Sequence, residues 1–204
     1  MEQYGENRLW FKRSDVTEEQ EVAQLAKDIE ERFGLLDGYL NTVYASAYKS
    51  ILDYTAEDLL YTMKGSWISA FIIFQNMLPL MRKAGGGSVV NTSSTMSLHP
   101  AANNAAYGSA KSALNYFTQC IAHDYSKEGI RANSILPGFF HAESRIPELT
   151  EQTKQLIKEK CLLERTASAR EVAEYAAFLL SDASSYITGG VLRVDGGYQM
   201  NNRY

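Results

Sequence analysis

One of the 13 tyrosines, Tyr107, is followed four residues later by a lysine, Lys111. Two residues at this spacing share one face of a helix. An ammonium group beside a phenol favours the phenolate and lowers the pKa of the tyrosine from about 10. Such a tyrosine can exchange a proton near neutral pH, so the pair predicts general acid–base chemistry. Taken alone the pair is weak evidence, because tyrosine and lysine on a solvated helix reach this spacing by chance.

The surrounding sequence supports the prediction of a site. Ser94 closes the run Asn91-Thr92-Ser93-Ser94 at the end of a predicted strand, and it precedes Tyr107 by thirteen residues. Open α/β sheets place their sites at that end of their strands. Two further motifs, Pro137-Gly138 and Asp195-Gly196-Gly197, follow later in the chain.

The elements that would position these residues alternate between strand and helix. Apolar runs predict strands over residues 9–12, 38–44, 88–92, 131–136 and 191–194. Helical spacing predicts helices over residues 17–33, 55–82, 106–127 and 168–180, and residues 140–165 read as loop and short helix. Capping boxes are predicted at Thr17 with Gln20, Thr55 with Asp58 and Ser168 with Glu171. The alternation predicts an α/β fold with a parallel sheet covered on both faces.

Composition narrows the class of protein. A chain of 204 residues suits a single domain over residues 1–204, and 45% hydrophobic residues are ordinary for a globular protein. The net charge of −4 argues against a general nucleic-acid binder. The apolar run at residues 67–74 is too short to span a bilayer, and residues 1–15 are too polar for a signal peptide. Two isolated cysteines and three scattered histidines indicate no disulfide framework and no metal site, so we expect a cytoplasmic protein without a metal.

From about residue 9 to residue 197 the chain resembles the short-chain dehydrogenases/reductases, especially their 3-oxoacyl-reductase-like branch. The spacing of the serine, the Tyr-x-x-x-Lys pair, Pro-Gly and the final Asp-Gly-Gly carries this resemblance. It implies that Ser94 holds a substrate carbonyl or hydroxyl and that Tyr107 transfers the proton. It also implies that Lys111 and Asn41 contact an NAD or NADP cofactor, and that Asp15 contacts its adenine.

The sequence departs from the family pattern at several positions. No glycine-rich turn follows a predicted strand and opens a helix, and residue 9 aligns with the start of the family's third strand. We therefore expect a partial Rossmann-like, doubly wound parallel sheet of about five strands that lacks the family's first two. Tyr44 stands where the family has a glycine against the cofactor, and it is expected to block that space. The family's active-site asparagine corresponds to Ser66, and its threonine after Pro-Gly falls near Ala142.

These departures predict a non-catalytic subunit, with the family's catalytic and cofactor positions retained as vestiges. Such a chain would bind no NAD(P) by itself and would assemble as a homo-oligomer or with a full-length family member. Residues 55–82 and 106–127 would form one interface and residues 168–197 a second, so we do not expect a stable monomer. Two alternatives stay open: an active NAD(P)-dependent oxidoreductase on a hydroxyl or carbonyl substrate, whose front lies upstream, and a decayed fragment without function.

A last prediction concerns residues 9–12. In the family's sheet two places separate this strand from the strand at residues 38–44, and both of these intervening places would be empty. Unpaired backbone groups are costly when buried, so we expect residues 9–12 to move inward and pair with residues 38–44. The alternative is that residues 1–12 are displaced or disordered.

Overall fold

A parallel four-stranded sheet forms the centre of the molecule in the computed structural model, which describes residues 9–200. The strands lie side by side in chain order, β1-β2-β3-β6. Their bounds are β1 Gly38–Asn41, β2 Gly87–Thr92, β3 Ile130–Pro137 and β6 Val191–Val194. Two short strands, β4 Phe140–His141 and β5 Ala167–Ser168, pair separately. The predicted α/β class and the parallel sheet are therefore confirmed, with four strands in the main sheet and not five.

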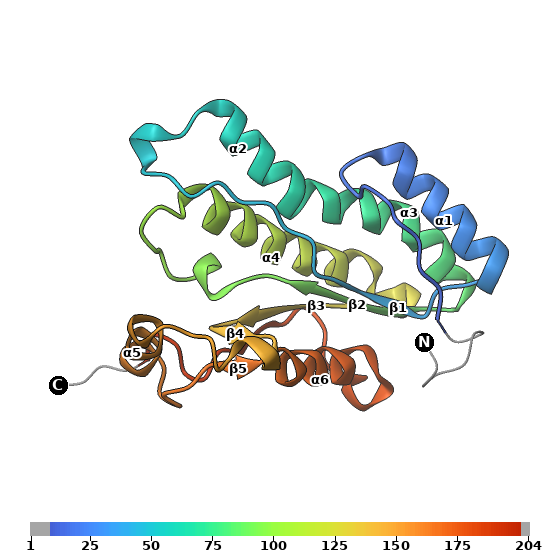
Figure 1. Cartoon of the computed structure of the whole chain (residues 1–204). Helices are drawn as coiled ribbons and strands as arrows, with labels where there is room; N and C mark the ends of the chain where they lie inside the picture. The colour runs from blue at the N-terminus through green and yellow to red at the C-terminus, as the bar shows by residue number, and fades with distance from the viewer. Residues whose placement is uncertain (1–8, 201–204) are drawn as a thin grey trace.

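Helices pack on both faces of this sheet (Figure 1). Four helices cover one face, while α6 covers the other and α5 lies on the same side. The helix bounds are α1 Glu19–Phe33, α2 Ala56–Met63, α3 Ser69–Lys83, α4 Ala105–Tyr125, α5 Glu151–Lys160 and α6 Ala169–Leu180. Successive residues of a strand point to opposite faces, and β2 supplies both cores in this way. Val89 packs into the core beneath α3 and α4, whereas Val90 packs into the core beneath α6.

The predicted helix over residues 55–82 forms, but it contains a π-helical turn. The capping box of Thr55 and Asp58 starts α2 as predicted. A π-helical turn over Lys64–Ile68 then joins α2 to α3. Gly65 in this turn lies so close to the preceding loop that an added Cβ would stand 2.4 Å from the Cβ of Ala45. The turn thus brings the helix into direct contact with the loop that follows β1.

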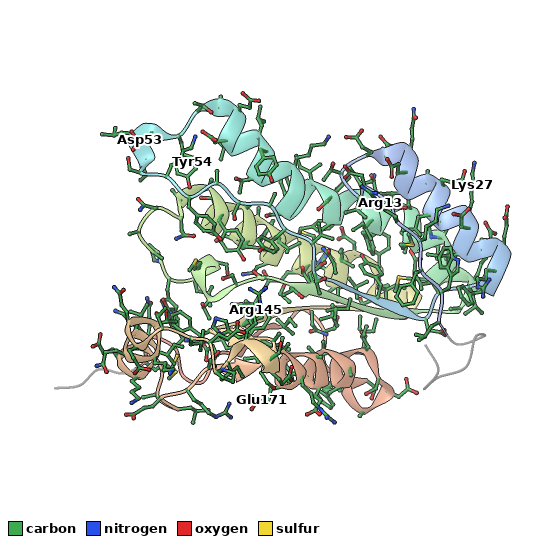
Figure 2. The ribbon with its side chains drawn as sticks, in the orientation of Figure 1. Arg13, Lys27, Asp53, Tyr54, Arg145 and Glu171 are labelled. Atoms are coloured by element: carbon green, nitrogen blue, oxygen red, sulfur yellow. The ribbon has the colours of Figure 1, made fainter. Side chains whose placement is uncertain are left out.

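The capping box at the start of α6 is also confirmed. The Ser168 hydroxyl accepts a hydrogen bond from the Glu171 amide, and the Glu171 carboxylate accepts one from the Ser168 amide. Glu171 also forms a bidentate ion pair with Arg165 and lies on the outer side of α6 (Figure 2). These contacts hold the pKa of Glu171 at about 2. Residues 165–171 therefore determine where α6 begins, through contacts among themselves.

Residues 9–12 do not form the predicted strand. Among the described residues β1 pairs with β2 only, so the predicted ladder between residues 9–12 and 38–44 is wrong. The segment lies against α1 instead: the ring of Trp10 meets the ring of Phe33 edge-on, and the Lys12 ammonium pairs with Asp28 at 2.6 Å. Phe11 points into solvent with 75% of its surface exposed. The alternative prediction was that residues 1–12 are displaced or disordered. Its part before residue 9 lies outside the described residues.

The predicted capping box at Thr17 and Gln20 is wrong as well. The helix begins two residues later, at Glu19, and its N-cap Glu18 makes no side-chain capping bond. The carboxylate of Asp15 instead accepts hydrogen bonds from the amide and the hydroxyl of Thr17. At the other end α1 stops at Phe33, which is the predicted end, and Gly34 terminates it with a positive φ of 81°. No helix within residues 9–200 has both the length and the apolar character needed to cross a bilayer.

Candidate active site

A cavity of about 420 Å³ opens at the carboxyl ends of β1, β2 and β3. Side chains from the strand ends, from α4 and from α6 line it, together with the loop after β1. The lining residues include Leu40, Tyr44, Tyr48, Ser94, Met96, Tyr107, Lys111, Phe140 and Val172. The cavity therefore contains all three predicted catalytic residues, Ser94, Tyr107 and Lys111. Three further wall residues were not predicted from the sequence: Tyr48, Met96 and Phe140. Tyr48 lies in a loop, Met96 in a 3-10 turn and Phe140 in a two-residue strand, and segments this short show no periodic pattern.

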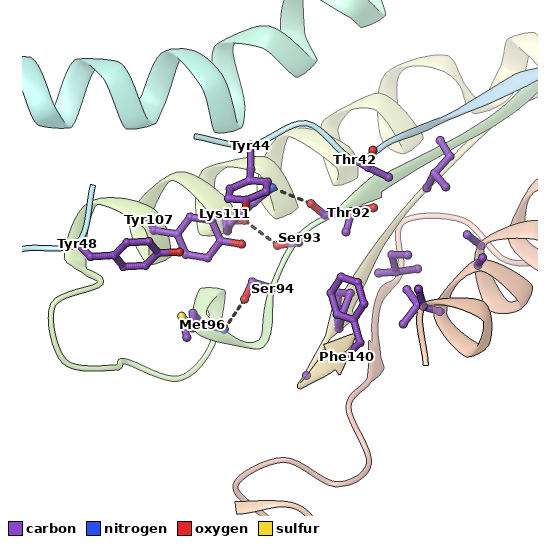
Figure 3. A pocket seen from close by; sticks show the side chains of 18 residues that line it. Thr42, Tyr44, Tyr48, Thr92, Ser93, Ser94, Met96, Tyr107, Lys111 and Phe140 are labelled. Carbon is purple, nitrogen blue, oxygen red and sulfur yellow. Dashed lines mark hydrogen bonds between the residues drawn. The ribbon is translucent and has the colours of Figure 1, made fainter. Parts of the chain in front are cut away.

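Ser94 and Tyr107 come from different elements and meet at this cavity (Figure 3). Ser94 follows β2 by two residues, and its hydroxyl accepts a hydrogen bond of 3.2 Å from the amide of Met96. This bond leaves the Ser94 proton free to be donated. Tyr107 lies in the first turn of α4, and its hydroxyl is close enough to Ser94 for this serine to lower the pKa of the phenol. The two hydroxyl groups are thus arranged to act on one atom of a bound molecule.

The expected fall in the pKa of Tyr107 is wrong for this structure. Burial is the largest effect and raises the pKa of Tyr107 to about 12, against the smaller lowering effect of Ser94. A phenolate would lose its hydration in this partly buried position, which disfavours the charged form. The neighbouring phenols of Tyr48 and Tyr44 raise the pKa further. Tyr107 therefore keeps its proton at neutral pH and is a hydrogen-bond donor.

Lys111 lies on the expected face of α4, but backbone carbonyls hold its ammonium group. Its Nζ donates to the carbonyl of Thr92 at 2.8 Å and reaches the carbonyl of Val43 at 3.5 Å. It also lies 5.8 Å from the centre of the Tyr107 ring. The side chain is only 2% exposed, and burial lowers the pKa of Lys111 to about 8. The ammonium therefore links β2 to the loop after β1, close to Tyr107 but without stabilising its phenolate.

Two further tyrosines flank Tyr107. The ring of Tyr44 meets the Tyr107 ring edge-on with centroids 6.2 Å apart, and the ring of Tyr48 lies 6.5 Å away. Figure 3 shows Tyr107 between these two residues. Tyr44 thus lines the site cavity beside Tyr107, and its expected obstruction of a cofactor stays a prediction.

The other predicted positions are occupied by structural contacts. Asn41 is buried in a chain of polar side chains: its Nδ2 donates to Asn91, and Asn91 in turn donates to Thr118. The Ser66 hydroxyl donates to the carbonyl of Ala45 at 2.6 Å and accepts from its amide. Ala142 precedes a short 3-10 helix over residues 143–145 and offers no side-chain hydrogen bond.

The two downstream glycine motifs pack against each other. The amide of Gly138 donates to the carbonyl of Val194, just before Asp195. A Cβ on Gly138 would lie 2.9 Å from the Cα and Cβ of Asp195, so the close approach requires glycine. The spacing of Pro137-Gly138 and Asp195-Gly196-Gly197 thus reflects where β3 and β6 end together, beside the cavity.

Residues 9–200 do not fit a complete nicotinamide dinucleotide. None of the strands described runs through a glycine-rich turn into a helix, which is the usual cradle for a pyrophosphate. The Asn41 side chain bonds to Asn91 and to the amide of Val43, Oδ1 of Asp15 accepts from Thr17, and the ring of Tyr44 lies beside Tyr107. The cavity presents the hydroxyl groups of Ser94 and Tyr107 together with mainly apolar side chains. Across the same residues no cluster of three or more His, Cys, Asp or Glu side chains is suited to a metal.

Comparisons with known proteins identify the family. The model of the enoyl-(acyl carrier protein) reductase family matches residues 1–199. The chain is 31% identical over 188 residues to a tropinone reductase homolog of Arabidopsis thaliana, covering 92% of this chain and 69% of that protein. A second such homolog of the same plant is 33% identical over 190 residues, with 92% and 72% covered. The chain belongs to the short-chain dehydrogenase/reductase family of oxidoreductases.

Solved structures agree with this assignment. A short-chain type dehydrogenase/reductase from Mycobacterium ulcerans superposes with a TM-score of 0.85 at 29% identity, covering 93% of this chain and 70% of the other. A 7α-hydroxysteroid dehydrogenase in complex with NADH and 7-oxo glycochenodeoxycholic acid superposes with a TM-score of 0.84 at 28% identity, with 92% and 73% covered. The Rossmann-like architecture of the chain is therefore that of the family.

Proposed function

We propose that this protein acts on a carbonyl or hydroxyl compound, which it holds at Ser94 and Tyr107. The protonated Tyr107 beside Ser94 in one cavity is the observation that carries this proposal. Two hydroxyl donors aimed at one oxygen polarise a carbonyl group, and the Tyr107 proton can pass to that oxygen as the carbonyl is reduced. The reverse reaction, oxidation of an alcohol, would need Tyr107 as the phenolate, which the raised pKa of Tyr107 disfavours at neutral pH.

The reductant of such a reaction is NAD(P)H by family resemblance, and a related hydroxysteroid dehydrogenase binds NADH. Since residues 9–200 do not fit the whole dinucleotide, the proposal assigns this chain the substrate and the proton only. Ser94 orients the oxygen, Tyr107 exchanges the proton, and Lys111 fixes the strand-end loop beneath them. We also propose a cytoplasmic location, which the two free cysteines support.

Binding of a simple ketone tests this proposal. We expect Tyr107→Phe and Ser94→Ala each to weaken the affinity for 2-heptanone about tenfold, because each change removes one donor to the ketone oxygen. Titration followed by NMR of the protein amides measures the affinities. Ser185→Ala removes an exposed hydroxyl far from the cavity and serves as the control. The proposal is wrong if the natural protein and all three variants bind 2-heptanone with equal affinity.

We propose, as a second candidate, a non-catalytic subunit that assembles with itself or with a full-length family member. Tyr44 supports this second candidate, because its ring lines the cavity and packs edge-on against the Tyr107 ring. Large apolar side chains are also exposed on the elements expected at the interfaces. They are Leu60, Tyr61, Phe71 and Tyr116 on one side and Tyr186 on the other. Such side chains favour association with a further subunit.

NADH fluorescence and sedimentation test the second candidate. For a non-catalytic subunit we expect the purified chain to show no saturable change in NADH fluorescence at micromolar concentrations, and we expect sedimentation to give a dimer or larger species. Tyr44→Gly should leave the sedimentation pattern unchanged, because Tyr44 lies in the cavity and not on the expected interfaces. Oxidation of NADH in the presence of 2-heptanone, or a monomer at micromolar concentration, would contradict the non-catalytic subunit.

A further inference from the structure

A second cavity, of about 830 Å³, lies next to the site cavity. Met96 lines both of them, so the two spaces adjoin at this side chain. One wall of the second cavity is the loop at residues 49–52, and the opposite wall is the loop at residues 96–105 that leads into α4. The Met96 side chain is therefore the boundary that a molecule held at Ser94 would have to pass to reach the second cavity.

The walls of the second cavity carry apolar side chains that the fold does not bury. Leu52 is 96% exposed, Ile51 is 77% exposed and Leu98 is 50% exposed. Ile51 and Leu52 stand on one wall and Leu98 on the other. Single exposed apolar side chains are ordinary, but apolar side chains on both walls of one cavity favour an apolar occupant.

Several polar groups around this cavity are already satisfied within the protein. The Lys49 ammonium pairs with the Asp58 carboxylate at 2.7 Å. The Ser97 hydroxyl donates to the carbonyl of Ser94 at 2.6 Å. The Tyr54 hydroxyl donates to the carbonyl of Ala47 and lies 3.2 Å from the carbonyl of Asn103, so it connects the two walls at the outer tip (Figure 2). Because these groups already have partners within the protein, none of them needs a charged ligand.

We infer that the substrate carries an unbranched hydrocarbon chain, which leaves the oxygen at Ser94 and Tyr107, passes Met96 and fills the second cavity. The inference rests on the proposed function, since that function places the oxygen. It assigns the substrate to the aliphatic ketones and secondary alcohols with a tail of several carbons. A second copy of this chain, seated on Ile51 and Leu52, is the competing occupant.

A series of 2-alkanones tests the inference in the complete protein. We expect 2-nonanone to bind about tenfold more tightly than 2-heptanone, because two further methylene groups leave water for the apolar walls. Ser109 is exposed on α4 and lines the second cavity, so Ser109→Trp should fill that space. This variant should reduce the gain of 2-nonanone over 2-heptanone to less than about twofold and leave the affinity for 2-butanone unchanged.

Two further variants complete the experiment. Lys127→Trp places the same side chain at an exposed position beyond the other end of α4 and should keep the tenfold gain. Leu52→Asp, at a position that is almost fully exposed, should weaken 2-nonanone binding without affecting the fold. The inference is overturned if affinity does not depend on chain length, if Ser109→Trp keeps the full gain, or if Leu52→Asp changes only the oligomeric state.

The outcomes also separate this inference from the proposed function. If the affinity for 2-alkanones depends on Tyr107 but not on the length of the alkyl chain, the inference is wrong and the proposed function still holds. Binding that is the same in Tyr107→Phe, or no binding of any 2-alkanone, removes both.

Discussion

Replacing Lys111 by methionine should change how the stability of the protein depends on pH. Below pH 8 the folded and the unfolded chain both carry the proton of Lys111, so the cost of burying its charge is constant. Between the folded pKa of about 8 and the usual value of 10.5 the folded chain has lost this proton while the unfolded chain retains it. The free energy of unfolding of the natural protein therefore rises through this window. Between pH 7 and pH 10 we expect the free energy of unfolding of the natural protein to rise by about 2 kcal/mol relative to that of Lys111→Met.

Urea unfolding of both proteins at the two pH values measures this difference. Lys158→Met removes an exposed ammonium on α5 and should show no such gain, while all other titrating groups are common to the compared proteins. A constant difference between the natural protein and Lys111→Met across this range would contradict the buried, ammonium-to-carbonyl arrangement of Lys111.

Replacing Asn91 by leucine should destabilise the protein by about 3 kcal/mol. Asn91 is 1% exposed and joins Asn41 to Thr118 through its side-chain amide, with bonds of 3.1 Å and 3.0 Å. Leucine is similar in size but can neither accept from Asn41 nor donate to Thr118. The amide of Asn41 would then be buried without this partner, which costs more than the lost bond itself.

The midpoint of urea unfolding reports this change. Gln152→Leu makes the same kind of substitution at an exposed position of α5, and its midpoint should move little. If Asn91→Leu unfolds at the natural midpoint, the polar chain from Asn41 to Thr118 does not stabilise the junction of β1, β2 and α4.

Elements with strong local signals were predicted well from the sequence. The last strand, at residues 191–194, has the predicted bounds, and the capping boxes at Thr55 and Ser168 form as expected. The two boxes depend on residues within one helical turn of each other. The same pattern at Thr17 and Gln20 nevertheless forms no box, since α1 begins at Glu19 with Glu18 as its N-cap.

Features that depend on tertiary partners were predicted poorly. Residues 9–12 have the composition of a strand, yet Trp10 packs on Phe33 and Lys12 pairs with Asp28, and both partners lie on α1. The predicted strand at residues 38–44 ends at Asn41, because the Asn41 side chain accepts from the amide of Val43 and the chain leaves the sheet.

The candidate site shows the same division. The spacing of Tyr107 and Lys111 correctly predicted a shared face of one helix, and Ser94 was correctly placed at a strand end. The direction of the Tyr107 pKa shift was wrong, because it depends on how deeply the loop with Tyr44 and Tyr48 buries the phenol. The Lys111 ammonium was assigned to Tyr107, but the carbonyl of Thr92 is its hydrogen-bond acceptor.

The carbonyl stretching frequency of bound 2-heptanone tests most directly whether Ser94 and Tyr107 hold a substrate oxygen. With the ketone labelled with ¹³C at the carbonyl, infrared difference spectra isolate this vibration from the protein background. We predict that binding moves the band to lower frequency, because two hydroxyl donors polarise the bond. Tyr107→Phe should return the band most of the way to its position in an apolar solvent. A bound ketone whose band does not move, or moves equally in Tyr107→Phe, would contradict the account.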